Sequence, residues 1–174
     1  MRTAIELEAG LAHIGASPKD AGIVELIVRR PAKNEREVLD EGQLDLELGL
    51  VGDMWHVRGT PKPDAQLTLM NARAAELIAQ GKDRWSLAGD QLYVDFDLSV
   101  ENLPAGTRVA VGDAVVEVTA LPHTGCSKFT ARFGSDAVKF VNQRPGRALR
   151  LRGVNAKVVA PGAVRVGDSI GKLS

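Results

Sequence analysis

Cysteine is the scarcest reactive residue in this chain, which has one thiol, Cys126, among 174 residues. A single thiol excludes a disulfide within the chain, and it excludes a zinc site or an iron–sulfur cluster held by four of its cysteines. The histidines, His13, His56 and His123, show no metal-site spacing, so no zinc site is expected. A reducing, cytoplasmic location is the simplest expectation for such a chain.

Long apolar runs, aromatic residues and net charge are scarce as well. No apolar stretch approaches the ~18 residues of a membrane span. Residues 1–15 carry early acidic side chains and no sustained apolar stretch, so no signal peptide is expected. Aromatic residues make up 4% of the chain and the formal net charge is zero. We therefore expect neither a nucleic-acid partner nor a membrane partner.

Standard nucleotide-binding motifs are also missing. The glycine-rich stretch GDMWHVRG, residues 52–59, lacks the GK[ST] ending of a phosphate-binding loop. No GxGxxG sequence follows a strand pattern. A nucleotide bound through either motif is not expected.

The chain does contain a succession of short strand patterns. Its length and its 44% of hydrophobic residues suit one globular domain. Strands are predicted at residues 43–50, 66–70, 91–98, 107–111, 114–121, 155–160 and 163–166, with a short final strand after residue 168. Helices are predicted at residues 18–30, 72–80 and 127–143, the last with a break at Gly134. Many short strands and few helices indicate a mainly β protein with a closed or nearly closed β-barrel.

Charge is distributed unevenly along the chain. Residues 35–53 hold seven acidic side chains and one basic one, whereas residues 120–160 hold eight basic side chains and one acidic one. Blocks of opposite sign attract each other within a domain, and a basic block around a thiol also suits an anionic ligand. Solvated surface charge is the plainer interpretation of the individual residues.

Cys126 lies in the segment LPHTGCSKF, where a strand pattern gives way to a helix pattern. A helix N-terminus and nearby positive charge favour the thiolate, the reactive and metal-binding form of cysteine. The alternative is an inert cysteine buried as a small hydrophobe. His123 has its own alternative, an ordinary turn residue, and three residues is the wrong separation for most cysteine–histidine protease pairs.

Three longer stretches resemble a known family. In chain order they are GLVGDMWHVRG (49–59), AGDQLYVDFDLSVENLPAGTRVAVGDAVVEVTALPHTGCSKF (88–129) and APGAVRVGDSI (160–170). This ordered set resembles the MOSC domain, which is named after the C-terminal part of molybdenum cofactor sulfurases. The resemblance covers residues 43–173. It implies a small stand-alone MOSC domain over residues 1–174, in which residues 1–42 form a helix-containing extension packed on the family core.

The resemblance implies a MOSC-type β-barrel with Cys126 as its central functional residue. In relatives that reduce N-hydroxylated compounds, such a cysteine ligates the molybdenum of a pterin cofactor. In the sulfurases, the domain is thought to receive or present sulfur for that cofactor. A soft thiolate suits molybdenum and also suits a persulfide, so Cys126 is the expected catalytic residue and metal ligand.

The resemblance also implies which residues would hold the cofactor, whose phosphate group arginine and lysine bind well. Gln91 occupies the place of an amide in cofactor-binding relatives, whereas Gly89 stands where those relatives have an arginine. The arginine that usually follows the Gly-Asp pair is also missing. The expected cofactor-binding residues are Asp53, His56, Arg58, Gln91, His123, Lys128, Arg132, Arg144 and Arg147. A purely structural turn explains Gly52-Asp53 equally well.

Three functions remain open at this point. The first is a molybdenum-pterin protein that reduces N-hydroxylated or related small molecules, with electrons from a donor protein. The second is a persulfide carrier loaded by a cysteine desulfurase, since this chain is too short to bind pyridoxal phosphate in a domain of its own. The third is a non-catalytic barrel that binds an anionic small molecule or a partner protein.

Overall fold

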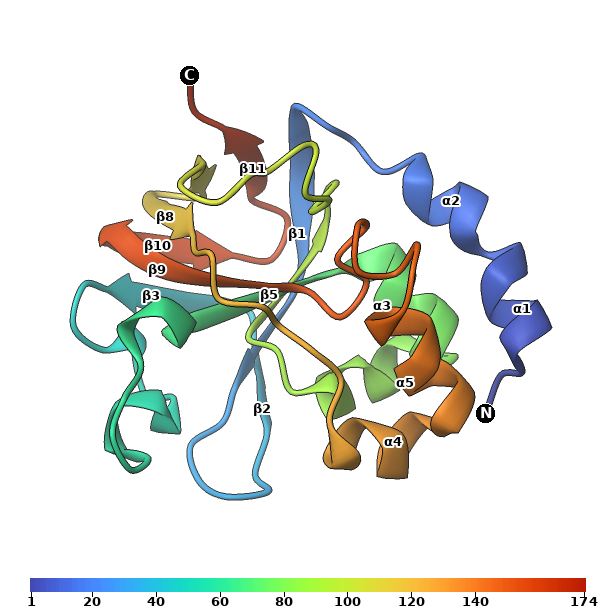
Figure 1. Cartoon of the computed structure of the whole chain (residues 1–174). Helices are drawn as coiled ribbons and strands as arrows, with labels where there is room; N and C mark the ends of the chain where they lie inside the picture. The colour runs from blue at the N-terminus through green and yellow to red at the C-terminus, as the bar shows by residue number, and fades with distance from the viewer.

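The computed structural model describes residues 1–174 as a β-barrel with a layer of helices on one side (Figure 1). The barrel strands, in their order around the ring, are β1 (Ala21–Arg29), β6 (Leu92–Asp95), β5 (Leu67–Asn71), β9 (Val154–Ala160), β8 (Ala114–Val118), β7 (Arg108–Val111) and β11 (Ser169–Lys172). Pairing of β11 with β1 closes the ring. All pairs are antiparallel except β5 and β6, which run parallel. The predicted mainly β fold with a barrel is therefore confirmed.

Alternation of side chains along the strands fills the barrel interior. In β7 and β8, Val109, Val111, Val116 and Val118 are buried, while intervening residues face outward. Period-two alternation of this kind places one face of each strand in the core. The turn between the two strands contains Gly112, whose φ of 55° is poorly tolerated by other residues.

Four further short strands complete the sheet structure. A second, three-stranded sheet consists of β10 (Gly162–Arg165), β3 (Glu41–Asp45) and β4 (Gly49–Leu50). Its side chains Leu44, Leu50 and Val164 belong to the barrel core. The fourth strand, β2 (Glu37–Leu39), pairs with the end of β1. The predicted strand over 43–50 is thus two strands joined by a turn.

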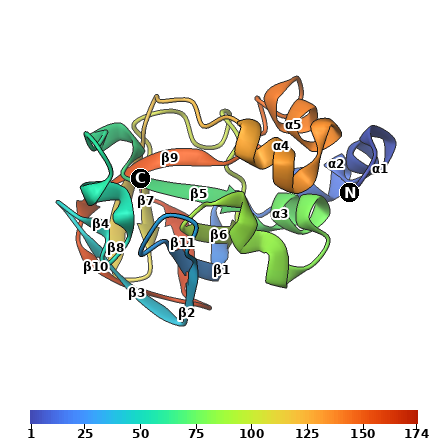
Figure 2. The same ribbon diagram turned by 90° about the horizontal axis from the view of Figure 1, so that it is seen from below.

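The helices lie together on one side of the barrel (Figure 2). They are α1 (Ala4–Ala9), α2 (Leu11–Gly15), α3 (Ala72–Ala79), α4 (Ser127–Phe133) and α5 (Ser135–Asn142), and the 3-10 turn η3 (Lys82–Ala88) lies with them. The 3-10 turns η1 (Met54–Val57) and η2 (Pro63–Ala65) lie apart from this layer, toward the left of Figure 2. A second core lies between this layer and the outer faces of β1, β5 and β6, where Tyr93 packs near Trp85 and the helix residues Ile78 and Phe129. None of the helices has the length and apolar character that crossing a membrane requires.

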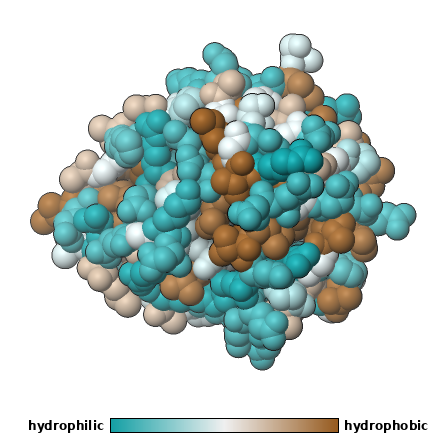
Figure 3. Space-filling view, turned by 180° about the vertical axis from the view of Figure 1, so that it is seen from behind, coloured by the Kyte–Doolittle hydropathy of each residue, from teal (hydrophilic) through white to brown (hydrophobic).

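The face of the molecule opposite to that of Figure 1 is mainly hydrophilic, with hydrophobic residues gathered near its middle (Figure 3). Large hydrophobic side chains are exposed at ten positions in the whole chain, among them Ile5, Ile23 and Val166. Exposed apolar residues of this kind are normal on a folded protein.

The helix predicted over residues 18–30 is wrong, because this segment contains strand β1. Its apolar residues are buried on both faces of the sheet: Val24 and Ile27 enter the barrel core, whereas Leu26 and Val28 face the helices. A register shift between Val24 and Leu26 allows this change of face. Residues 21–29 are therefore part of the barrel wall.

The other two predicted helices are confirmed. One is α3, and the other is the α4–α5 pair, which is interrupted at Gly134 with a φ of 94°. Helix α1 was not predicted, although Thr3 and Glu6 form a capping box at its start.

Candidate functional site

Cys126 lies between the loop that follows β8 and the first turn of α4, as the sequence patterns predict. Its side chain is exposed and lines a cavity of about 380 Å³. The alternative of a cysteine buried as a small hydrophobe is therefore wrong.

The cavity wall carries a large excess of positive charge. Its only acidic residue is Glu35. Its basic residues are Arg30, Lys33, Arg36, Arg58, Lys128, Arg132 and Arg152. They come from the loop after β1, from the region of η1, from α4 and from the segment before β9. Converging cations in a concave site attract anions and raise their local concentration.

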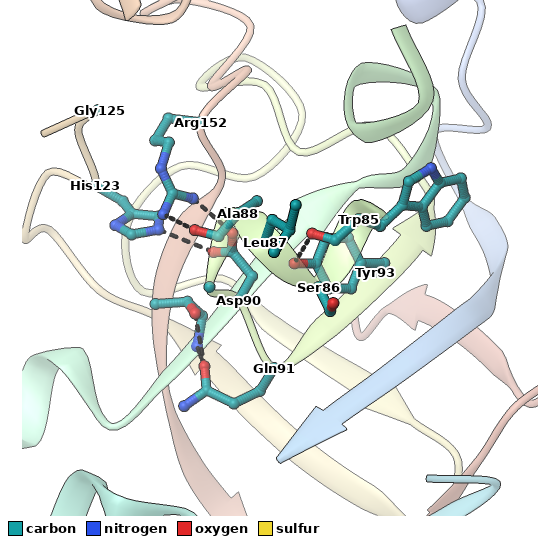
Figure 4. A network of polar contacts seen from close by, with 12 residues as sticks. Trp85, Ser86, Leu87, Ala88, Asp90, Gln91, Tyr93, His123, Gly125 and Arg152 are labelled. Atoms are coloured by element: carbon teal, nitrogen blue, oxygen red, sulfur yellow. Dashed lines mark hydrogen bonds and ion pairs between the residues drawn. The ribbon is translucent and has the colours of Figure 1, made fainter. Parts of the chain in front are cut away.

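A buried carboxylate holds one of these cations in place (Figure 4). Asp90 is fully buried; its Oδ2 accepts a hydrogen bond of 2.5 Å from Arg152 Nη1, and its Oδ1 lies 2.9 Å from His123 Nε2. Burial alone would raise the pKa of Asp90, but the charges of Arg152 and His123 hold it well below its ordinary range. Asp90 therefore remains ionised and orients both side chains at the cavity.

Arg152 is fixed by its ion pair with Asp90 and by two further contacts. Its Nη2 donates to the Ala88 carbonyl at 2.8 Å, and its guanidinium lies 5.1 Å from the centre of the Phe129 ring. The residue is 7% exposed, and its Nε is buried without any hydrogen-bond partner. Buried polar atoms are nearly always hydrogen-bonded in native proteins, so this unpaired donor is an exception within the cavity wall.

The surroundings of Cys126 lower the pKa of its thiol. Partial burial opposes ionisation, but the backbone N–H groups of Phe129 and Lys128 and the charge of Arg152 outweigh it, and the pKa of Cys126 is lowered. The thiolate is consequently more abundant at neutral pH than for a free cysteine.

A second buried carboxylate, Asp53, positions Arg30 at the cavity. Asp53 is fully buried, and its two oxygens accept hydrogen bonds from Arg30 Nε at 3.0 Å and Nη2 at 2.8 Å. Gln91 is 1% exposed and uses both ends of its amide: Nε2 donates to Asp53 at 3.3 Å, and Oε1 accepts from Thr68. Asp53 and Gln91 therefore lie behind the cavity wall and support it.

Gly89, which occupies the place of an arginine in cofactor-binding relatives, is surrounded by arginines from other segments. Arg30 Nη1 donates to the Gly89 carbonyl at 3.1 Å, and Arg152 donates to the preceding carbonyl of Ala88. Gly89 has a φ of 93°, a conformation in which an arginine would be strained. The guanidinium groups of Arg30 and Arg152 thus place positive charge at this turn, although residue 89 is not an arginine.

The structure brings together some of the predicted site residues and separates others. Five line the same cavity: Arg58, His123, Cys126, Lys128 and Arg132. Asp53 and Gln91 lie behind its wall.

The remaining three predicted residues do not line this cavity. His56 is half-buried in η1, and its Nδ1 has no hydrogen-bond partner. Arg147 lines a second cavity, and Arg144 is exposed and lines neither.

Sequence reasoning missed Arg30, Arg36, Asp90 and the individual role of Arg152. Arg152 was visible only as one member of the basic block. Asp90 lies within the AGDQLYVDFD stretch, but nothing in its sequence context indicates burial. Arg30 directly follows the segment whose strand was predicted as a helix.

The chain is thus a β-barrel protein with an exposed thiol of lowered pKa in a basic cavity. Comparison with family models assigns the chain more specifically: residues 59–171 match the model described as the MOSC domain. The chain therefore belongs to the MOSC domain family, which is associated with molybdenum cofactor binding. The comparison with curated proteins gave no match.

Solved structures show the same fold. The YuaD protein from Bacillus subtilis is 16% identical with a TM-score of 0.62, and the match covers 86% of this chain and 94% of that one. YiiM from Escherichia coli is 23% identical with a TM-score of 0.58, and the match covers 87% of this chain and 70% of that one. YiiM from Geobacillus stearothermophilus is 14% identical with a TM-score of 0.53, covering 88% and 73%.

Proposed function

We propose that this MOSC protein binds a molybdenum-pterin cofactor in the cavity at Cys126, with the Cys126 thiolate as the protein ligand of molybdenum. The observation that supports it is the coincidence of one exposed thiol of lowered pKa with seven basic residues around a single cavity. A soft, ionised sulfur is a suitable molybdenum ligand, and the cations suit the phosphate of the pterin.

The residues present fit such a group. Arg152 is held at the cavity wall by Asp90 and the Ala88 carbonyl, and Arg30 is held beside it at the 88–89 turn. Arg58, Lys128 and Arg132 add charge from the cavity wall. These five side chains would hold the anionic cofactor, while Cys126 would supply its sulfur ligand.

When bound, the cofactor would supply a redox-active molybdenum able to reduce N-hydroxylated or related small molecules. The protein's own residues would bind the cofactor and keep the side chains around it in a fixed orientation. Asp90 fixes the His123 ring and the Arg152 guanidinium at the cavity, and Asp53 fixes Arg30 in the same way. Electrons would come from a separate donor protein.

The test is the molybdenum and pterin content of protein purified from cells that make the cofactor. We expect near-stoichiometric molybdenum and pterin in the natural protein and a loss of molybdenum in Cys126→Ala. Lys82→Ala is the matched control, since Lys82 is an exposed cation outside this cavity. Absence of molybdenum from the natural protein would contradict the proposal.

The same exposed, activated thiol also supports a second function, that of a persulfide carrier. The Cys126 thiolate would attack the terminal sulfur of a cysteine desulfurase persulfide. A new S–S bond forms at Cys126, the donor's S–S bond breaks, and the donor cysteine leaves as a thiolate.

Mass spectrometry after incubation with a pyridoxal-phosphate-dependent desulfurase and cysteine tests this role. The expected result is one additional sulfur atom on the peptide containing Cys126. An unchanged peptide mass, with the desulfurase active, would exclude the carrier.

A further inference from the structure

A second cavity, of about 280 Å³, adjoins the first and shares His123 and Arg152 with it. It lies between the loop after β8 and the turns that precede β9, and it is lined by Arg147 and Arg150 in addition to Arg152. None of its lining residues is acidic. The cavity is therefore positively charged and separate from Cys126, which does not line it.

Two of its three arginines have no carboxylate partner. Arg147 is exposed and forms neither an ion pair nor a side-chain hydrogen bond. Arg150 donates only through Nη1, to the carbonyls of Leu98 at 3.3 Å and Leu103 at 2.6 Å. Both guanidinium groups retain N–H donors that could bind an oxyanion in the forked geometry typical of arginine.

The fold keeps Arg150 in place at an energetic cost. Its backbone has a φ of 50°, in the left-handed region that residues other than glycine rarely adopt. Its side chain is partly desolvated, which lowers its pKa. Backbone strain and a partly desolvated charge without a carboxylate partner are both features found at ligand sites.

Arg152 adds a third cation to the wall of the second cavity. Its side chain lines both cavities and is held between them by Asp90 and the Ala88 carbonyl. Apolar side chains, including Leu121, Pro122 and Val154, form another part of the second cavity wall. The site therefore offers charge for an anion and an apolar surface for an organic group beside it.

We propose that the second cavity is a binding site for a phosphate-class oxyanion, held by Arg147, Arg150 and Arg152. Arg152 is shared with the Cys126 cavity, whereas Arg147 and Arg150 line only the second cavity. The anion is either free phosphate or the phosphoryl end of a small organic molecule, and the two are distinguished by comparing probes.

Amide NMR spectra of the protein, recorded during titration with inorganic phosphate and with phenyl phosphate, test the proposal. Gly146 and Gly153 line only the second cavity, whereas Gly89 lines only the first, so their amide signals report the two sites separately. We expect saturable shifts at Gly146 and Gly153. Tighter binding of phenyl phosphate identifies an organic phosphate, and tighter binding of inorganic phosphate identifies the free anion.

Two exposed arginines provide matched variants. Arg147→Gln should weaken binding reported by Gly146 and Gly153 about tenfold, as expected for loss of a charged hydrogen bond, and leave Gly89 unchanged. Arg58→Gln, which alters only the first cavity, should leave Gly146 and Gly153 unchanged. Shifts that fail to saturate, or that follow Arg58→Gln and not Arg147→Gln, would overturn the proposal whether or not molybdenum binds at Cys126.

Discussion

The cavity at Cys126 and a third cavity of similar size, termed the third hollow, differ in how their charges are balanced. The cavity at Cys126 measures about 380 Å³, and the third hollow, bounded by β1, α3 and η3, measures about 410 Å³. In the third hollow Arg73 lies 2.7 Å from Asp95, and Lys82 lies 3.0 Å from Glu25. Each of these two cations therefore has its own carboxylate.

The Cys126 cavity is different because most of its cations lack such a partner. Of its seven basic residues, Arg30 pairs with Asp53 and Arg152 pairs with Asp90, and the remaining five form no ion pair. The volume of a hollow is therefore a poor guide to function in this protein. The informative property is positive charge that the fold gathers and leaves unneutralised.

The largest predicted effect comes from removing the carboxylate that supports the cavity. Asp90→Asn leaves the Arg152 charge buried without a counter-ion, and the expected loss in the free energy of unfolding is about 3–5 kcal/mol. Asp95→Asn, in the third hollow, breaks a partly exposed pair and should cost about 0–1 kcal/mol. Urea denaturation of both variants measures the difference. Equal losses would show that the two hollows are held by interactions of the same kind.

Acidic pH should remove the stabilisation that the ionised Asp90 carboxylate gives to the folded protein. The pKa of Asp90 is lowered in the folded protein, so the unfolded chain takes up the proton first as the pH falls. The contribution of Asp90 to stability is fully present above the ordinary carboxylate pKa of about 3.9 and is lost below it. Urea denaturation at several acidic pH values should therefore give a steeper decline for the natural protein than for Asp90→Asn. Parallel declines would contradict this assignment.

The reactivity of the thiol should depend on the charge of the cavity. The rate of Cys126 alkylation by iodoacetamide, measured against pH, should give an apparent pKa below the ordinary value for cysteine of about 8.5. Arg152→Gln removes a positive charge that favours the thiolate, so it should raise this pKa and slow alkylation at pH 7. Arg73→Gln, in the third hollow, is the control and should change nothing.

The outcome for Arg152→Gln is interpretable only if the variant is folded, which circular dichroism checks. Added salt provides a second test in the natural protein, because screening weakens the contribution of Arg152. A thiol pKa that responds to neither change would rule out an electrostatic contribution from the cavity.

The smallest effect is expected at the rim of the cavity. Sulfate should protect Cys126 from alkylation, and Arg58→Gln should raise the protecting concentration about two- to fivefold, because an exposed charge contributes only about 0.5–1 kcal/mol. Lys82→Gln removes an exposed cation from the third hollow and should have no effect. The measurement is the alkylation rate against sulfate at constant ionic strength. Equal effects of the two variants would show that net charge, and not the cavity, attracts the anion.

The barrel could be predicted because most of its strands have a recognisable local sequence pattern. Strands β7 and β8 alternate apolar and other residues around a Gly-Asp turn, which is a reliable signal of a hairpin. Strand β1 could not be recognised in this way. Both of its faces are buried and its register shifts after Val24, so its apolar residues fall at helical spacing by coincidence.

The site could be predicted only where it is local in the sequence. His123, Lys128 and Arg132 lie within six residues of Cys126, and the strand-to-helix transition is visible in the pattern. Arg30, Asp90 and Arg152 meet because the barrel closes and brings distant segments together. No local sequence pattern predicts contacts between such distant segments, and nothing in the sequence shows that Asp90 is fully buried.

X-ray absorption at the molybdenum edge, recorded on cofactor-loaded protein and on Cys126→Ser, tests whether the Cys126 thiolate ligates the metal. We expect the natural protein to have one more Mo–S contact than the variant, with the sulfur supplied by Cys126. An identical sulfur coordination in the two proteins would show that molybdenum binds without the thiol and would contradict the proposed function.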